Sequence, residues 1–223
     1  CTASSVEDTN WAGGRDIAGG TQVVSPAATS TYTLTCEGLG GASEVTNRIV
    51  SVVPPPAPTL TSDFATIALG GSATLTWGSG NATSCSASSV QDASWNGTRS
   101  TAGASQPVTP SVTSIYRLTC EGLGGASEFT EVTVTVGPPV APTLTASFAE
   151  MPLGGSSILT WGSGNATSCS ASSPEDSAWS GGRVITGGTQ SVSPTVTSTY
   201  TLTCNGLGNA VDSVSVTVTV GPP

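Results

Sequence analysis

The chain repeats one pattern every 84 residues, and the register never slips. Two cysteine series keep this spacing: Cys1, Cys85 and Cys169, and Cys36, Cys120 and Cys204. Aromatic and arginine positions follow it too: Trp11, Trp95 and Trp179; Trp77 and Trp161; Tyr32, Tyr116 and Tyr200; Arg15, Arg99 and Arg183. A fixed period without insertions indicates a tandem array of small modules. Such an array is typical of a rod or a polymer rather than of a catalyst.

The cysteines of each repeat lie 35 residues apart, so one disulfide per module is the simplest pairing. This pairing is Cys1–Cys36, Cys85–Cys120 and Cys169–Cys204. Modules of this size lie near the lower limit for a self-sufficient core and commonly need a covalent staple. Reduced or metal-bound pairs are the alternative, but the chain has no C-x-x-C and no histidine. Because disulfides persist in oxidising compartments, we expect an extracellular or cell-surface location.

The net charge of the chain limits the classes of partner that it is expected to bind. Five Lys and Arg residues stand against fourteen Asp and Glu, a net charge of −9. This acidity argues against nucleic acid, which needs basic patches, and against anionic membrane surfaces. No apolar run is long enough to span a bilayer, so no membrane span is expected in this segment. The remaining partner classes are further copies of the same repeat, in a homo-polymer or a continuing array, and a surface glycan.

Catalytic and metal chemistry find little support. The many Ser and Thr residues have no histidine or lysine beside them to act as a base, so we expect no enzyme activity and no cofactor. Asp8, Asp92 and Asp176 recur with the period, but calcium needs six or more oxygen ligands. Each module clusters too few acids for that, and no metal site is predicted.

Proline clusters mark the module boundaries, at Val53–Pro58, Gly137–Pro142 and Gly221–Pro223. Such runs favour extended, semi-rigid spacers. The expected domains are 54–137 and 138–223, each complete, and 1–53, which is incomplete. The first segment would carry strands C to G of a sandwich without A and B, the part that corresponds to Val140–Ser168. We expect it to be completed from outside, by upstream residues or by a neighbouring subunit.

Between the clusters the pattern is β throughout. Apolar residues alternate with Ser or Thr over Ser72–Trp77, Thr83–Ala87 and Val214–Val220, and Gly78–Asn81 is interpreted as a turn. Ile115–Cys120 is a further strand, in which Tyr116, Leu118 and Cys120 share one face. About seven short strands in some 80 residues predict a β-sandwich. In sandwich lettering the first cysteine lies on strand C and the second on F, so the bridge would join neighbouring strands of one sheet. Trp77 and Trp161 should then point inward from strand B and be almost fully buried.

Two sequence strings carry a family resemblance. They are G-G-S-A-T-L-T-W-G-S-G-N-A-T-S-C at Gly70–Cys85 and S-V-T-S-I-Y-R-L-T-C at Ser111–Cys120. Both resemble the immunoglobulin-like tandem repeats of bacterial secreted and surface proteins, such as adhesins, stalks and fibres. The resemblance covers every module. It implies an all-β array of immunoglobulin-like sandwiches with an extracellular structural or binding role, and it transfers no catalytic residue.

The loop after the first cysteine of each repeat is the most distinctive surface candidate. Its copies are Glu7–Arg15, Gln91–Arg99 and Glu175–Arg183. In one interpretation Trp11, Trp95 and Trp179 are sugar-stacking platforms. In the other, which their retention in all copies favours, they pack within a domain or against the next one. Arg15, Arg99 and Arg183 would then lie on the rings or pair with the neighbouring aspartates.

These observations favour a structural component of an extracellular fibre, filament or surface stalk. The alternatives are an adhesin or carbohydrate-binding array, and spacer modules of a secreted enzyme. Three asparagines in N-x-S/T triplets, Asn81, Asn96 and Asn165, are interpreted as turn residues rather than as glycan sites.

Overall fold

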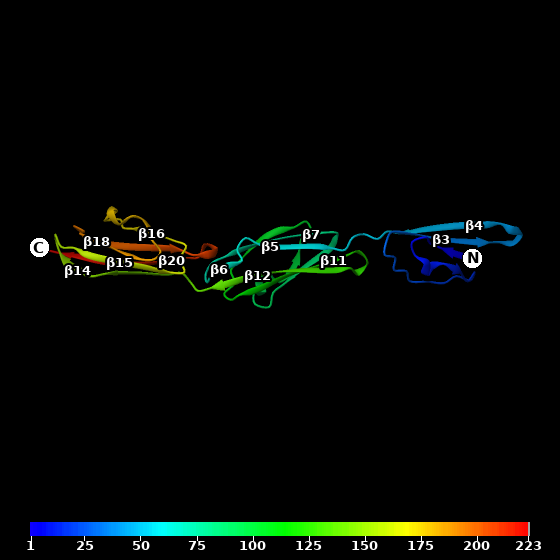
Figure 1. Ribbon diagram of the computed structural model, residues 1–223, viewed down its shortest axis with the longest axis horizontal. Coiled ribbons are helices and arrows are strands. Elements are labelled where there is room, and N and C mark those ends of the chain that lie inside the picture. Colours follow the sequence, from blue (N-terminus) through cyan, green and yellow to red (C-terminus); the bar gives the residue numbers. More distant parts are fainter. Residues whose placement is uncertain (223) are drawn as a thin grey trace. The chain divides into compact units, whose positions relative to one another are not determined.

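The computed structural model describes residues 1–222 and is built almost entirely from β-strands (Figure 1). Pro223, the last residue of the third proline cluster, lies outside the described residues. The chain divides into two compact units, which meet in sequence between Pro55 and Pro56. We refer to Cys1–Pro55 as the first unit. The other unit holds two sandwiches, called here the second domain (residues 56–137) and the third domain (residues 138–222).

The first unit is a single antiparallel sheet in the order β2-β1-β3-β4. Its elements are β1 (Thr2–Ser4), the 3₁₀ turn η1 (Thr9–Trp11), β2 (Gly13–Gly14), β3 (Ser30–Glu37), η2 (Leu39–Gly41) and β4 (Ser43–Val50). Residues 15–29, between β2 and β3, contain no strand.

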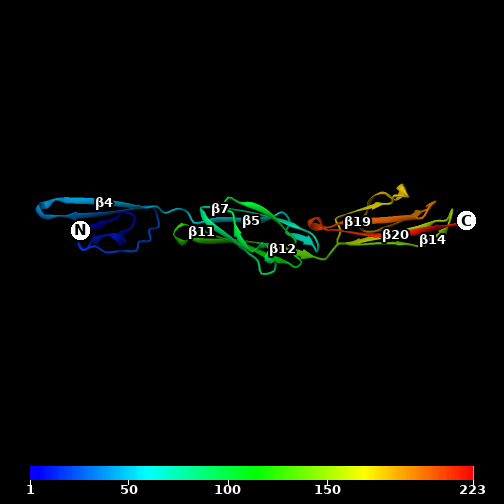
Figure 2. The ribbon, with the colours of Figure 1, turned by 180° about the vertical axis from the view of Figure 1, so that it is seen from behind.

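The second domain is a sandwich of a three-stranded sheet, β10-β7-β5, and a five-stranded sheet, β6-β12-β11-β8-β9 (Figure 2). Its elements are β5 (Ala57–Ser62), β6 (Thr66–Ala68), β7 (Ala73–Gly80), β8 (Ala82–Ser88), η3 (Ala93–Trp95), β9 (Gly97–Arg99), β10 (Ala104–Val108), β11 (Ser114–Gly122), η4 (Leu123–Gly125) and β12 (Ser127–Gly137). The pair β6–β12 is parallel and the other pairs are antiparallel. This is the A-B-E and C-F-G division of an immunoglobulin-like sandwich, and it confirms the predicted fold class.

The third domain repeats this topology, with sheets β13-β15-β18 and β14-β20-β19-β16-β17. Its elements are β13 (Ala141–Ala146), β14 (Glu150–Pro152), β15 (Ser157–Gly164), β16 (Ser168–Ser172), η5 (Ser177–Trp179), β17 (Gly181–Arg183), β18 (Gly188–Val192), β19 (Ser198–Asn205), η6 (Leu207–Asn209) and β20 (Val211–Gly221).

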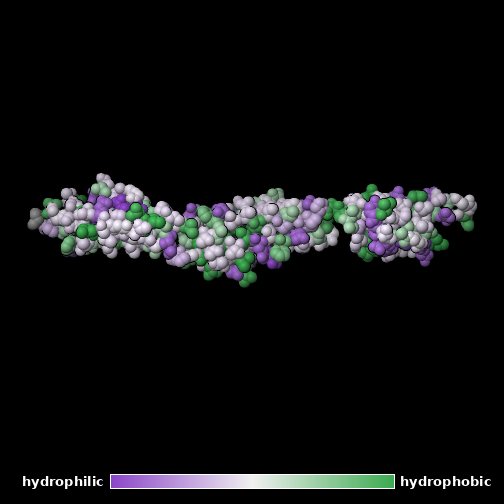
Figure 3. All heavy atoms as spheres, viewed as in Figure 1, coloured by the Kyte–Doolittle hydropathy of each residue, from purple (hydrophilic) through white to green (hydrophobic). Residues whose placement is uncertain are grey.

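Alternation along the strands explains the core. On β11, Tyr116, Leu118 and Cys120 point inward and are fully buried, because successive side chains of a strand face opposite sides of the sheet. They pack against Leu75 of β7 and other residues of the facing sheet in one cluster. The outward positions of β11 hold Ile115, Arg117 and Thr119. Hydrophobic and hydrophilic residues are accordingly interspersed on the visible surface of each unit (Figure 3). The part of the chain that the structure describes has no helix long and apolar enough to span a bilayer.

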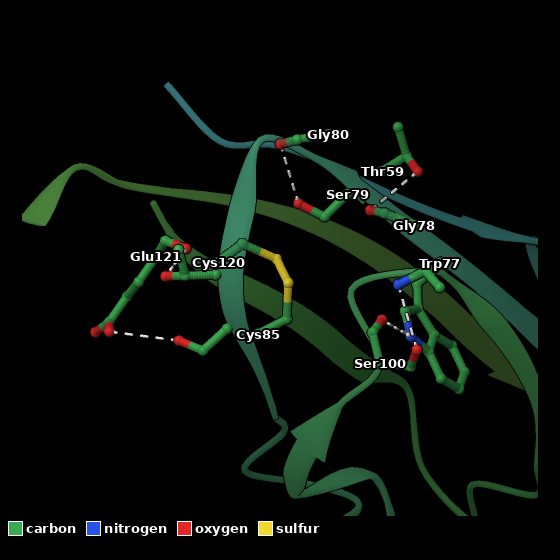
Figure 4. The surroundings of a disulfide bond; sticks show 12 residues. Thr59, Trp77, Gly78, Ser79, Gly80, Cys85, Ser100, Cys120 and Glu121 are labelled. Atoms are coloured by element: carbon green, nitrogen blue, oxygen red, sulfur yellow. Dashed lines mark hydrogen bonds between the residues drawn. A yellow bond between two sulfur atoms is a disulfide. The ribbon is translucent and has the colours of Figure 1, made fainter. Parts of the chain in front are cut away.

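The three disulfides join Cys1 to Cys36, Cys85 to Cys120 and Cys169 to Cys204. In the second domain Cys85 and Cys120 are directly opposite each other on neighbouring strands β8 and β11, with Cα atoms 4.1 Å apart. Figure 4 shows this bridge and, on β7, the Trp77 indole, whose N–H donates to the Ser100 carbonyl at 3.3 Å. The bridge therefore lies within one sheet, on neighbouring strands, as expected.

One of the two expectations about the strand-B tryptophans needs correction. Trp77 is buried, but Trp161 is only half-buried. Across the sheet Trp77 faces Ala104, whereas Trp161 faces Gly188 and its ring lies 2.6 Å from where a Cβ of Gly188 would stand. A glycine offers no side chain to cover the ring, so part of the Trp161 ring stays exposed.

The predicted turn at Gly78–Asn81 is also too long. Strand β7 runs through Gly80, because Ala57, Pro58 and Thr59 of β5 pair with Gly80, Ser79 and Gly78. The reversal is carried by Asn81 at φ 58°, a left-handed conformation that asparagine tolerates. Asn165 takes the same role at φ 59°.

Candidate functional site

The recurring tryptophan of each complete domain belongs to an interior cluster. Trp95 is the last residue of the turn η3, in which the Ser94 backbone N–H donates to the side chain of Asp92. Its indole N–H donates to the Arg117 carbonyl at 3.1 Å, and its ring stands edge-on to Tyr116 at 5.8 Å and to Trp77 at 5.4 Å. The side chain is 0% exposed.

Arg99 closes this cluster from the outside. Its guanidinium carbon lies 4.3 Å from the centroid of the Trp95 ring, and one terminal nitrogen donates to the Trp95 carbonyl. Its Nε is buried without a hydrogen-bond acceptor, so ring faces take the place of a polar partner. Burial lowers the pKa of Arg99. Of the two roles considered for the arginine, the structure shows the contact with the ring, and Arg15 and Arg183 make the same contact at 4.5 Å and 4.3 Å.

The aspartate of the same loop pairs with the tyrosine instead. The Tyr116 hydroxyl donates to Asp92 at 2.8 Å, and the Tyr200 hydroxyl donates to Asp176 at 3.1 Å. Burial raises the pKa of Tyr116, and the bond to the Asp92 carboxylate raises it further. The same two causes raise the pKa of Tyr200 to about 12. The pKa of Asp92 is lowered, because hydrogen bonds from Ser94 and Tyr116 outweigh the opposing effect of its burial.

This geometry decides between the two interpretations of the tryptophans for two of the three copies. Sugar stacking needs an open ring face, but Trp95 and Trp179 are both 0% exposed and packed against tyrosine and tryptophan rings. A ligand role for these two residues is therefore wrong. They also lie within their own domains, so they make no inter-domain contact.

Trp11 of the first unit is different. It keeps the partners of the cluster, with its indole N–H on the Thr33 carbonyl at 3.2 Å and Tyr32 edge-on at 5.7 Å. However, the ring is only half-buried and lines a cavity of about 320 Å³ together with Leu34 and Val50.

A second candidate site is the contact between the second and third domains, which we call the glycine joint. It consists of the turn Ile67–Ser72 and the loop Gly206–Ala210. The Ser72 N–H donates to the Gly208 carbonyl at 2.6 Å, a backbone hydrogen bond between domains. Ile67 and Ala68 are buried, as is Val140 of the linker.

Close backbone approach explains the glycines of this joint. A Cβ on Gly71 would stand 2.8 Å from the Gly208 and Leu207 carbonyl oxygens. One on Gly208 would stand 2.3 Å from Cγ2 of Ile67, and Gly208 also has φ +67°. Sequence reasoning missed this site and assigned the geometry between domains to the prolines alone. The available signal was the recurrence of L-G-G-S at Leu69 and Leu153 and of G-L-G at Gly38, Gly122 and Gly206.

Among residues 1–222 no group of three or more His, Cys, Asp or Glu side chains could hold a metal ion. Asn96, one of the three N-x-S/T asparagines, caps η3 and accepts the Ser89 N–H at 2.6 Å, whereas Asn81 and Asn165 make the turns described above.

No family model matches this chain, and no curated protein matches it. Similar solved structures include an I-band fragment from titin, at 12% identity and a TM-score of 0.43, covering 77% of this chain and 68% of that one. Fibronectin(III)-like modules of CbhA from Clostridium thermocellum are similar at 12% identity and a TM-score of 0.38, covering 74% of this chain and 95% of that one. Likeness at this level says nothing about activity or partners.

Proposed function

We propose that the chain is a structural component of an extracellular fibre, filament or surface stalk made of tandem immunoglobulin-like modules. The observation that carries the proposal is the glycine joint. It links successive domains by backbone groups and buried small residues, and a joint of this kind fixes one domain against the next more firmly than a linker alone.

Both halves of the joint recur with the repeat. The turn half reappears at Met151–Ser156, where Gly154 has the same φ of +87° as Gly70. The loop half reappears at Gly38–Ala42 and Gly122–Ala126, where Gly40 and Gly124 have φ +80° and +71°. A polymer needs the same interface at each step. Each of the two complete domains carries both the turn half and the loop half of the glycine joint.

The interior of the domains supports the same conclusion. In both complete domains the recurring Trp and Arg pack inside the domain, so these side chains are not available to bind a ligand. The three disulfides support placement outside the cytosol.

The test is immunogold electron microscopy of intact source cells with an antibody raised against the full chain. The proposal expects label at regular intervals along surface fibres or stalks, and loss of label when the antibody is pre-absorbed with the chain. Label confined to the cell interior, or on secreted material without any fibre, would contradict it.

Carbohydrate binding is the second candidate, and one observation favours it: Trp11 is half-buried beside Arg15, Asp16 and Gln22, which line a second cavity of about 250 Å³. An oligosaccharide array probed with the full chain tests it. Binding that is lost in Trp11→Ala and kept in Trp95→Phe would support this role.

A further inference from the structure

A surface cavity of about 410 Å³ lies on the second domain, where the loop between β8 and β9 meets the outer face of β11 and β12. We call it the amide cavity. Its volume falls within the range of small-ligand sites, about 300–1,000 Å³. Its lining includes Val90, Gln91, Asn96, Ile115, Arg117 and Glu131.

The amide cavity is a place where the second domain departs from the repeat. Five of its lining positions differ from both other copies of the repeat. These residues, with their counterparts 84 residues before and after, are Gln91 (Glu7, Glu175), Asn96 (Ala12, Ser180), Ile115 (Thr31, Thr199), Arg117 (Thr33, Thr201) and Glu131 (Asn47, Ser215). The cysteines and the recurring tryptophans keep their identity through all copies. Differences that gather around one cavity indicate a role that belongs to this domain alone.

Two amide side chains of the cavity are held at one end and open at the other. Asn96 Oδ1 accepts the Ser89 N–H at 2.6 Å, and Gln91 Oε1 accepts the Ile115 N–H at 3.4 Å. Within residues 1–222 neither amide has an acceptor for its NH₂ group. The loop that carries them is anchored in the core by Trp95. Both NH₂ groups are therefore donors already positioned before a ligand arrives.

A charge pair forms another part of the lining. Arg117 Nε donates to the Glu131 carboxylate at 2.7 Å, and the Arg117 guanidinium carbon lies 4.0 Å from the centroid of the Phe129 ring. These two contacts fix the arginine, yet the Arg117 and Glu131 side chains are still 44% and 41% exposed. In the described part of the chain, the terminal guanidinium nitrogens and the second carboxylate oxygen make no hydrogen bond of their own.

These groups match a ligand that carries many hydroxyls. The two amides and the guanidinium donate hydrogen bonds, and the carboxylate accepts them. A hydroxyl group both donates and accepts, so a sugar can use all of them. Ile115 is 45% exposed and Val90 is 95% exposed, which provides apolar surface for the C–H groups of a sugar ring.

Two other ligand classes fit less well. A charged ligand finds no net charge to pair with, because Arg117 and Glu131 already compensate each other. An extended peptide finds no open strand edge for main-chain hydrogen bonds, because β8, β11 and β12 are all interior strands of their sheet.

We propose that the amide cavity binds a neutral saccharide, which accepts hydrogen bonds from Gln91, Asn96 and Arg117 and donates one to Glu131. This site goes beyond the proposed structural role and does not depend on it. It also differs from the Trp11 candidate, because all of its residues belong to the second domain.

The experiment begins with an array of neutral and acidic oligosaccharides probed with the full chain. The neutral oligosaccharide that binds best is then titrated into isotope-labelled full chain and followed by NMR. The side-chain NH₂ signals of Gln91 and Asn96 and the backbone amide signal of Ile115 shift with added sugar. The amide of Thr199, the counterpart of Ile115 in the third domain, is the internal control, and its signal stays in place.

Two variants install the residues of the third domain in the cavity. Arg117→Thr weakens binding by about tenfold or more, because a hydrogen bond from a charged donor is lost. Asn96→Ser weakens it as well. Thr119→Ala is the matched control, because Thr119 is the next outward residue of β11 and does not line the cavity. It retains full affinity. Equal denaturant midpoints of the three variants verify that the domain stays folded.

Three results would overturn the inference. One is an array on which no oligosaccharide binds, and another is a preference for acidic over neutral sugars. The third is binding that is lost in Trp11→Ala and kept in Arg117→Thr, which would assign the sugar to the first unit. None of these results changes what the immunogold experiment reports, so a failure here and a failure of the proposed structural role are distinguishable.

Discussion

At the scale of single residues, one tryptophan position of the repeat is buried in two copies and half-buried in another, depending on whether a second sheet covers it. Trp95, Trp179 and Trp11 occupy the same place in the repeat and make the same hydrogen bond and the same contact with an arginine. Only the first two are covered by a second sheet. The same side chain is therefore a core residue in the complete domains and part of an open surface in the first unit.

Truncating this tryptophan should cost very different amounts in the two settings. Trp95→Ala is expected to lower the free energy of unfolding of its domain by about 3–5 kcal/mol, as for large core aromatics. Trp11→Ala should cost less, because part of its ring already meets water. Denaturant unfolding of the full chain, followed by exchange at peptides from each part, measures both losses. Equal losses at the two positions would contradict this assignment.

Tyr200 should make the third domain sensitive to alkali. Its pKa is about 12 in the folded chain and about 10 when unfolded. Between these values the unfolded state binds fewer protons than the folded state, so stability falls as the pH rises. We expect constant stability up to about pH 9 and a progressive loss between about pH 10 and 12.

Thermal melting across this range, followed at the third domain, is the measurement. Tyr200→Phe is the control: it removes the hydroxyl bond to Asp176 and should be somewhat less stable at pH 7, but with a flatter alkaline decline. A decline of the same steepness in this variant would assign the alkaline sensitivity to other groups.

At the scale of elements, the sequence predicts the strands well because their signal is local. The alternation at Ile115–Cys120 lies inside β11, and the cysteine spacing is compatible with the cross-strand pair Cys85–Cys120. Trp161 could not be placed in the same way. Its exposure depends on Gly188, a residue of another strand, and no local pattern reports what lies across a sheet.

The glycine joint escaped prediction for a related reason. A glycine at a tight turn and a glycine at a close approach between domains look alike in sequence. Gly124 and Gly208 occupy the same place in the G-L-G loop and have similar backbones, at φ +71° and +67°. Only the structure shows that a Cβ would meet open space at the first and the Ile67 side chain at the second.

This pair gives a matched test of the joint. Gly124→Ala and Gly208→Ala should share the backbone strain of a left-handed alanine, on the order of 1–2 kcal/mol. Gly208→Ala should in addition separate the joint, since its Cβ collides with Ile67. The measurement is exchange of the Ser72 amide, which donates to the Gly208 carbonyl. Exchange of the Ser72 amide should accelerate in Gly208→Ala and stay slow in Gly124→Ala. The same exchange rate in both variants would mean that the contact between the second and third domains is not formed.

At the scale of the whole molecule, the chain combines parts that bury very different amounts of apolar surface. The second and third domains each close a core between two sheets, whereas the first unit has one sheet and a half-covered face. Hydrophobic stabilisation follows the apolar area removed from water. The parts therefore should not unfold together, although they share the same sequence repeat.

We expect calorimetry of the full chain to show two separate transitions, with the first unit melting at the lower temperature. Each disulfide closes a loop of 35 residues, worth roughly 4 kcal/mol in the chain-entropy model. Replacing Cys1 and Cys36 by alanine should accordingly shift only the lower transition, and replacing Cys85 and Cys120 only the upper one. A single transition that both replacements move together would show that the first unit shares a cooperative core with the rest of the chain.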